Sequence, residues 1–380
     1  MPIHKIEGIK KDGLQKYHVR INYCDDNGVK KQLTRTAWGM EAAKLLERQL
    51  DHEIHVKGEK PVKKMTVQEH FDEYTEAKQY EVRETTLDKT KRNFKYYILP
   101  MLKDVPIDKL TVKGLQDWKL SMEKRKLSLN SKKQAFSDLR AMLNYAIKME
   151  YLSKNPLSIV GNFKDKEFIK QSMTIYTAEE FPQFISAARK VAIEREEKQK
   201  NFSEWDYYVF FNIAFYTGLR KGEIYALKWS DIDGAFLSVT RSITQRLKGG
   251  DRETPPKNKS SVRTLQMPQP LRQVLAEHRK RQETQDNFTE DYRICGGVNS
   301  PRNSSIQRRN ERYAAMAGLE VIRIHDFRHS HVSVLANEGI NIQEIARRLG
   351  HARIEMTWNT YSHLYPREEE RAVDVLDKIA

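Results

Sequence analysis

The chain has 380 residues, which is more than one typical domain, so two or three domains are expected. Its formal net charge of +15 favours a polyanionic partner such as nucleic acid, although charge alone also fits a merely soluble basic protein. A membrane protein is excluded by the lack of any run near the ~20 apolar residues of a spanning helix, and the start of the chain has no apolar secretion signal.

Cysteine usage points to a reducing compartment. Only Cys24 and Cys295 are present, too few for a disulfide framework or a zinc site. We therefore expect a cytoplasmic protein whose thiols are reduced.

Residues 1–60 are expected to form a three-stranded sheet followed by a helix. Leu14–Tyr23 alternates between apolar and polar side chains, and Val29–Arg35 is a basic returning strand after the turn signal Asp26-Asn27-Gly28. Apolar residues then recur at helical spacing from Ala42 to Leu50. A sheet with one basic face fits a DNA groove, although the same face can simply meet water.

The next region, 65–157, is predicted to be helical and follows a polar linker at Glu53–Lys64. Thr66–Glu69 is a capping box, and further helices are expected at about 86–98, 112–125 and 130–150. Several basic residues here are candidate phosphate contacts, although each alone is typical of a solvated surface charge: Lys89, Lys91, Arg92, Lys95, Lys132, Lys133 and Arg140.

Residues 173–380 are predicted to be mixed but mainly helical, after a second linker at Ser158–Ser172. A capping box at Thr177–Glu180 opens this region. Its expected elements are helices at 178–198 and 204–216, strands at Phe236–Leu247 and Ser261–Met267 joined by the loop Lys248–Lys259, and helices from Gln269 onward. The predicted fold class is therefore mostly α with small β elements, an α+β protein of three domains.

Short motifs in this last region combine arginine, histidine and tyrosine. They are Thr217-Gly218-Leu219-Arg220, His325-Asp326-Phe327-Arg328-His329, Leu349-Gly350-His351 and Tyr361-Ser362-His363. Arginine and histidine can neutralise and protonate phosphoryl oxygens, and a tyrosine hydroxyl can serve as the nucleophile. Each motif alone is weak evidence, and most single arginines are ordinary ion-pair residues.

The residue types suggest a division of labour in attack on a phosphodiester. Arg220 and Arg328 are the candidate clamps, because a guanidinium stays protonated and can fork onto two oxygens. Tyr361 is the candidate nucleophile, and since a free phenol has a pKa of ~10, His325 is the candidate that assists its deprotonation. His351 is expected to hydrogen-bond the phosphate, the alternative being a buried packing histidine.

Neighbouring polar residues are expected to support this group. Glu223 either holds Arg220 or caps the helix that follows it, and Asp326 orients its neighbours by hydrogen bonding. His329 and His363 are interpreted as structural. No P-loop and no carboxylate pair dedicated to a metal is evident, so no cofactor is expected.

Taken in this order, the motifs resemble those of the tyrosine recombinase family of phage and mobile-element integrases, and the resemblance covers essentially the whole chain. It implies a site-specific DNA recombinase that cleaves and rejoins strands through a 3′-phosphotyrosyl intermediate. It also implies three domains: an arm-binding module at 1–60, a core-binding domain at 65–157 and a catalytic domain at 173–380.

The resemblance also implies a general acid for the leaving 5′ oxygen. Lys257 occupies the place of the family's hairpin lysine, with Lys259 as the nearby alternative. The family often has Thr after this lysine, whereas this chain has Asn258, so the hairpin contact can differ.

The implied partners are double-stranded DNA with core-type and arm-type attachment sites, a homo-tetramer on that DNA, an excisionase and a DNA-bending host protein. The tail Arg367–Ala380 carries an apolar stripe that docks either on a neighbouring protomer or on its own domain. Three other functions stay open: a chromosome-dimer resolvase, whose relatives usually lack the N-terminal module, a monomeric type IB topoisomerase, and a non-enzymatic DNA-binding regulator.

Overall fold

The structure is a computed structural model. It describes residues 3–11, 13–24, 30–51, 65–165, 173–247, 250–255 and 259–362, together with Val373, Leu376 and Asp377. The chain divides into two compact units, Met1–Phe168 and Ile169–Ala380, and each is described by itself.

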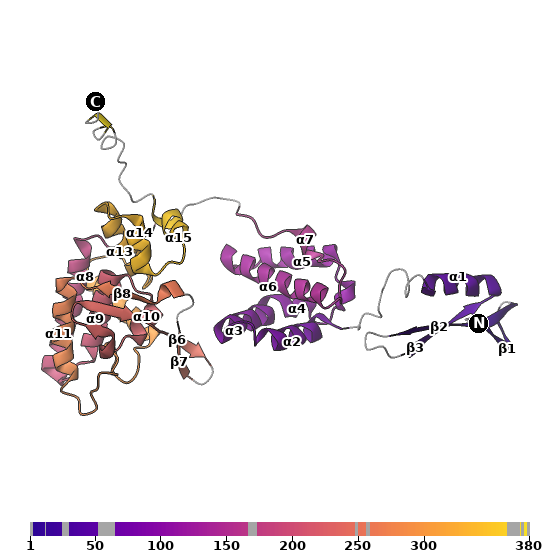
Figure 1. The fold of residues 1–380 in the computed structure, drawn as a ribbon, viewed down its shortest axis with the longest axis horizontal. Helices are drawn as coiled ribbons and strands as arrows, with labels where there is room; N and C mark the ends of the chain where they lie inside the picture. The colour runs from indigo at the N-terminus through magenta and orange to yellow at the C-terminus, as the bar shows by residue number, and fades with distance from the viewer. Residues whose placement is uncertain are drawn as a thin grey trace. The chain divides into compact units, whose positions relative to one another are not determined.

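The first unit begins with an antiparallel sheet in the order β1 (Ile3–Lys11), β2 (Leu14–Cys24), β3 (Lys30–Trp38), followed by α1 (Met40–Asp51) (Figure 1). The alternation of β2 predicts the buried side, because its apolar residues join those of β3 and α1 in a small core: Val19, Ile21, Ala37, Ala43 and Leu50. The expected three strands and helix are confirmed.

Strand β1 of this module does not follow from the sequence pattern, because its residues do not alternate cleanly between apolar and polar. The predicted turn at 26–28 and the linker expected at 53–64 lie outside the described residues, and α1 ends before that linker, at Asp51.

The helical block of the first unit starts at α2 (Val67–Lys78). Thr66 accepts a hydrogen bond from the Glu69 amide at 3.2 Å, and Glu69 Oε2 accepts one from the Thr66 amide at 2.7 Å, which confirms the capping box. The other elements are α3 (Glu84–Asn93), the π-helical turn η2 (Phe94–Ile98), α4 (Leu99–Leu102), η3 (Ile107–Lys109), α5 (Val112–Glu123), α6 (Leu129–Lys148) and α7 (Leu157–Val160).

The interior of this block is largely apolar. Phe71 stacks on Phe94 with ring centroids 4.2 Å apart, and buried Trp118 donates its indole N–H to the Tyr97 carbonyl at 2.8 Å. The predicted helices lie close to the observed ones, but the linker expected from Ser158 was wrong at its start, because that residue lies within α7.

The second unit is built on α9 (Ser203–Thr217), which is apolar on nearly all faces and therefore runs through the core. Helix α9 packs against α8 (Glu180–Gln199), α10 (Lys221–Ala226), α11 (Gln269–Gln282) and α13 (Asp326–Asn337) (Figure 1). α12 (Asn303–Ala317) packs on α8, and α14 (Ile342–Leu349) and α15 (Ile354–Tyr361) pack on α13 and on each other. An aromatic cluster fills the centre: Phe184, Phe211, Tyr313 and Phe327. No helix within the described ranges is long and apolar enough to cross a membrane.

The strands of this unit correct the sequence prediction. One strand was expected at 236–247, but the structure has β5 (Phe236–Val239) and β6 (Ser242–Leu247) in two different sheets. β5 pairs with β4 (Ile232–Asp233) and β8 (Arg263–Gln266), whereas β6 pairs with β7 (Gly250–Thr254), a strand that lies in the expected loop.

The chain passes from one sheet to the other between β5 and β6. Arg241 lies at this point and forms an ion pair with the buried carboxylate of Asp231, which anchors the start of the hairpin to the first sheet.

Candidate active site

Arg220 lies at the junction of α9 and α10. Gly218 ends α9 with φ +64°, and a Cβ there would come within 2.7 Å of the His331 ring, so this position requires glycine. The Arg220 amide donates to Glu223 Oε2 at 2.9 Å, which caps α10. The Arg220 side chain is 38% exposed, so it can reach a ligand outside the fold.

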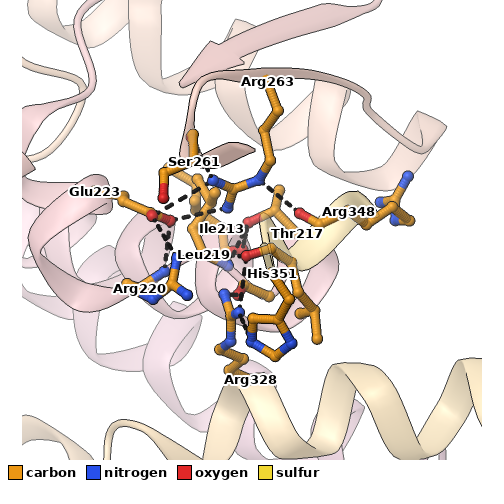
Figure 2. A network of polar contacts seen from close by, with 12 residues as sticks. Ile213, Thr217, Leu219, Arg220, Glu223, Ser261, Arg263, Arg328, Arg348 and His351 are labelled. Atoms are coloured by element: carbon orange, nitrogen blue, oxygen red, sulfur yellow. Dashed lines mark hydrogen bonds and ion pairs between the residues drawn. The ribbon is translucent and has the colours of Figure 1, made fainter. Parts of the chain in front are cut away.

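Glu223 joins two guanidiniums. Its buried carboxylate accepts hydrogen bonds from Arg220 Nη1 at 3.0 Å and from Arg263 Nη2 at 2.9 Å, reached from two directions in Figure 2. Burial alone raises the pKa of this carboxyl, but the hydrogen bond and charge of Arg263, with help from Arg220, hold it below the ordinary value. Glu223 therefore both caps the helix and fixes Arg220, the two roles that the sequence left open.

Three guanidiniums meet at the carboxyl end of α14. The Arg348 carbonyl accepts a hydrogen bond from Arg263 Nε at 2.6 Å. The Leu349 carbonyl accepts from Arg328 Nη2 at 2.8 Å and from Arg220 Nη1 at 3.4 Å. The last carbonyls of a helix lack partners within it and form its negative end, so this terminus attracts cations.

Gly350 makes this convergence possible. It follows α14 with φ +64°, and a Cβ at this position would lie 2.8 Å from Arg263 Nη1. The glycine of the Leu-Gly-His motif therefore ends the helix and leaves room for a buried arginine.

Arg328 and His351 form a direct contact. Arg328 is 3% exposed, donates to the Gly218 carbonyl at 2.7 Å, and places Nη2 2.8 Å from His351 Nε2. A guanidinium has only donors, so His351 Nε2 accepts and the ring proton lies on Nδ1, 2.8 Å from Thr357 Oγ1.

The charges of these two groups follow from burial. Burial and the neighbouring Arg328 lower the pKa of His351 to about 4, so the ring is neutral at pH 7. Burial and the Arg220 charge lower the pKa of Arg328 to about 9, which still leaves the guanidinium positive at pH 7.

Tyr361 is the last residue of α15 and is 2% exposed. Its ring joins a small apolar cluster with Val332, Ala336, Ile345 and Leu349. Its hydroxyl lies 2.5 Å from His329 Nδ1. Burial raises the pKa of Tyr361 to about 12, although the Arg328 charge opposes this shift.

Two histidines pack together at the start of α13, His325 just before the helix and His329 one turn along it. Their rings meet edge to face with centroids 5.1 Å apart. Burial lowers the pKa of His325, and the charges of Arg328 and Arg220 contribute further, although the Asp326 carboxylate opposes this shift. The ring at the Tyr361 hydroxyl is His329, which the sequence interpretation had treated as structural.

Asp326 fixes this face of α13. Its carboxylate accepts hydrogen bonds from Arg323 Nε at 2.8 Å and Nη2 at 2.9 Å, and Oδ1 lies 3.8 Å from His329 Nε2. This agrees with the expected orienting role of Asp326.

The structure thus brings five of the six candidate residues into one region: Arg220, His325, Arg328, His351 and Tyr361. The sixth, Lys257, lies outside the described residues, and so does His363. Lys259 begins the short 3-10 helix η5 (Lys259–Ser261).

Arg263 is the residue that sequence reasoning missed. It occupies an inward-facing position of β8, where exposed and buried residues alternate, and its side chain is 4% exposed. An arginine at an inward position of a short strand is rarely tolerated without partners, and that pattern was the available signal.

This arrangement can bind and attack a phosphoryl group. Two guanidiniums and a histidine offer donors to phosphoryl oxygens, and a phenol lies on the adjacent helix. Among the residues that the structure describes, no group of three or more His, Cys, Asp or Glu side chains is arranged to hold a metal ion.

Comparison with protein families gives two matches. Residues 175–368 match the phage integrase family, and residues 66–122 match the phage integrase N-terminal SAM-like domain.

Similar individual proteins are also found. The ICEBs1 integrase of Bacillus subtilis (strain 168) is 31% identical over 300 residues, which cover 76% of this chain and 77% of that protein. The XerC-like tyrosine recombinase of Caldanaerobacter subterraneus subsp. tengcongensis is 28% identical over 264 residues, 63% of this chain and 64% of that protein.

Two solved structures show the same fold. The Tn1549 transposon integrase in complex with transposon right end DNA aligns with a TM-score of 0.64 at 21% identity, covering 83% of this chain and 100% of that one. A lambda integrase dimer bound to a COC′ core site aligns with a TM-score of 0.56 at 18% identity, covering 95% of each chain.

Proposed function

The chain belongs to the phage integrase family, and we propose that it recombines DNA through Tyr361, with Arg220 and Arg328 as the phosphate clamp. It is a tyrosine recombinase, an integrase that inserts and excises a mobile element by site-specific recombination. One observation carries the residue assignment: guanidiniums from α10 and α13 share the Leu349 carbonyl, while the same α13 contacts the Tyr361 hydroxyl.

The clamp binds the scissile phosphate before any bond changes. Arg220 and Arg328 donate to the nonbridging oxygens, where negative charge grows as the new P–O bond forms. His351 is held beside Arg328 and adds a donor once its ring turns from the guanidinium to the phosphate. We assign a further oxygen contact to His325, whose ring packs edge to face on His329.

Cleavage then exchanges one phosphoester bond for another. The Tyr361 oxygen attacks phosphorus, a 3′-phosphotyrosyl bond forms, and the bond to the 5′ oxygen breaks. We assign the proton for that leaving oxygen to Lys257, with Lys259 as the alternative. A 5′ hydroxyl of the partner duplex later attacks the phosphotyrosine and reverses these steps, so bond energy is kept without ATP.

Access to the Tyr361 oxygen has to open for this chemistry. The phenol is 2% exposed, so the residues that cover its oxygen have to move before a phosphate bound by Arg220 can reach it, while the contact of that oxygen with His329 is kept. The apolar cluster around the ring is small, which keeps the cost of this movement low.

The three-domain division supports a role for each region. The outward side of β2 in residues 1–60 carries basic and hydrogen-bonding residues, which suits arm-type DNA sites: Lys16, His18, Arg20 and Asn22. In the helical domain, 65–157, a polar groove of about 470 Å³ includes Lys89, Asn93 and Lys133 and suits the phosphates of a core-type site. Catalysis belongs to residues 173–380.

The partners follow from the reaction. Double-stranded DNA is the substrate, and two strand exchanges on two duplexes need four protomers. The lambda integrase, which has a similar fold at a TM-score of 0.56, is a tetramer on a Holliday junction in one solved structure. We propose that an excisionase and a DNA-bending host protein set the direction, and that the enzyme acts in the cytoplasm.

A nicked suicide duplex tests this proposal. A pool with a randomised centre is incubated with the protein in EDTA, and adducts that survive denaturation are collected and sequenced. We expect a defined sequence to be captured by the wild type and none by Tyr361→Phe, with duplex binding unchanged. Persistent adducts in the Phe variant would remove Tyr361 from the role of nucleophile.

A further inference from the structure

The contact between His329 and Tyr361 has the geometry of a nucleophile with its base. The phenolic oxygen lies 2.5 Å from His329 Nδ1, and the opposite ring nitrogen lies 3.8 Å from the Asp326 carboxylate. A nucleophile, a base and an acid that orients the base form the usual arrangement for activating a hydroxyl.

The surroundings favour the tautomer that this role needs. The Asp326 carboxylate near Nε2 favours a proton on that nitrogen, which leaves the Nδ1 lone pair toward the phenol. Arg323 holds the same carboxylate through two hydrogen bonds of 2.8 and 2.9 Å, so its position is set independently of Tyr361.

His325, the alternative base, is less well placed. Its ring meets His329 edge to face with centroids 5.1 Å apart, and the ring nitrogen that lies 2.5 Å from the Tyr361 hydroxyl belongs to His329. A base in this reaction has to become positively charged, and the Asp326 carboxylate, 3.8 Å from His329 Nε2, stabilises that charge.

We infer that His329 is the catalytic residue that takes the phenolic proton of Tyr361, with Asp326 as its positioning residue. The inference rests on the proposed function. As the bond between the Tyr361 oxygen and phosphorus forms, the phenolic proton moves to His329 Nδ1, and the departing 5′ oxygen takes a proton from the general acid. In the joining step His329 returns its proton to the Tyr361 oxygen as the phosphotyrosyl bond breaks.

The pH dependence follows from the groups around the ring. His325, Asp326 and Arg328 face His329 from α13, Arg323 from the segment before it, and Tyr361 from α15. Burial and the neighbouring His325 lower the pKa of His329 to about 4, so the ring is ready to accept a proton at pH 7. Cleavage should therefore hold its rate as pH falls from 7 and decline only as pH approaches about 4, where the ring becomes protonated.

Replacement of His329 by Asn separates positioning from proton transfer. The Asn oxygen can accept the Tyr361 hydrogen bond in place of Nδ1, but it cannot take the proton. The duplex whose sequence the wild type captures in the selection above is used at saturating concentration. We expect His329→Asn to form the covalent adduct about 10²–10⁴-fold more slowly than the wild type. Duplex affinity should be unchanged, and the acid limb of the rate profile should be lost.

Two further measurements identify the step. Imidazole added to His329→Ala should restore part of the rate, whereas it should not act on His331→Asn, a control for the loss of another buried histidine on α13. A 5′-bridging phosphorothiolate, whose leaving group needs no proton, should rescue Lys257→Ala but not His329→Asn.

The outcomes are distinct. Absence of any adduct with the wild-type protein defeats the proposed function itself. If the wild type forms adducts and His329→Asn matches its rate and acid limb, His329 is not the base. A slow variant that imidazole leaves unchanged, or that the phosphorothiolate rescues, equally overturns the inference.

Discussion

The helical block of residues 65–165 and the second unit bury different kinds of side chain. The block has an apolar interior whose buried charged residue, Lys132, pairs with Glu123 at 2.8 Å at the edge of the core. The second unit buries several ionisable groups beside its aromatic core: Glu223, Arg263, Asp326, Arg328 and His331.

This difference agrees with the proposal that the helical block binds DNA and the second unit carries out catalysis. A surface that contacts DNA phosphates works with solvated lysines on a stable scaffold, because counterion release supplies the binding free energy. A site that stabilises a transition state needs charges fixed in place and shielded from water before substrate arrives. Burying these charges in the second unit costs desolvation free energy. Hydrogen bonds to the carbonyls at helix ends and ion pairs offset that cost.

Loss of a buried arginine should give the largest effect. Arg328→Lys removes the guanidinium that donates hydrogen bonds to the Gly218 and Leu349 carbonyls and to His351. We therefore expect the free energy of unfolding to fall by about 2–4 kcal/mol. Adduct formation should slow by about 10²–10³-fold. Lys132→Met in the helical block should cost less than ~1 kcal/mol. Urea denaturation measures the free energy of unfolding, and adduct kinetics measure the rate. Equal losses of stability for Arg328→Lys and Lys132→Met would contradict the difference between the two regions.

Glu223 and Arg263 should act as one unit with Arg220. We expect Glu223→Gln and Arg263→Met each to slow adduct formation by about 30-fold, because either change frees Arg220 from its support, a loss of about 2 kcal/mol. The double variant should be little slower than either single one, with a coupling of about 1–2 kcal/mol. Additive losses in this cycle would mean that Arg263 does not act through Glu223.

Acid should weaken the second unit more than the helical block. Burial lowers the pKa values of His351 and His329 to about 4 and that of His331 to about 3. Below about pH 6.5 these histidines therefore bind protons in the unfolded chain but not in the folded unit. The free energy of unfolding falls as pH drops from about 6.5 toward 4.

Thermal unfolding followed from pH 7 to pH 5 checks this expectation. The midpoint of the second unit should fall by about 5 °C or more. The helical block contains His70, whose pKa is also lowered by burial, so it provides a smaller internal reference. His331→Asn should reduce the pH dependence of the second unit, and an unchanged slope would contradict the assignment.

Surface lysines of the helical block should give the smallest effect. Lys89→Ala and Lys133→Ala should each reduce the slope of log affinity against log salt by about 1 and weaken binding across all sequences alike. The adduct rate at saturating DNA should not change. A rate loss that saturation fails to restore would place catalysis, as well as binding, in the block.

Periodicity and capping predicted most of the elements. The Thr66–Glu69 and Thr177–Glu180 boxes place two helix starts, and Gly218 ends α9 as expected, because these signals act within one turn of chain. The β6–β7 hairpin was missed, since its strands pair only with each other and the Arg241–Asp231 ion pair at its start joins residues that show no local pattern.

The site was predictable as a set of residue types but not as a set of contacts. The motifs mark Arg220, Arg328 and His351, and the structure brings their side chains together at the end of α14. Arg263 lies outside these motifs, and His329 lies within one but was interpreted as structural, because the contacts of both residues join positions 40 and 32 residues apart.

The central claim is that Tyr361 forms the covalent bond to DNA. The most direct test digests the denatured adduct with protease and nuclease and locates the modified residue by mass spectrometry. We predict a nucleotide joined through its 3′ phosphate to the oxygen of Tyr361, in wild type and in Lys257→Ala with a phosphorothiolate duplex. A nucleotide on another residue, or a bond through a 5′ phosphate, would contradict the account.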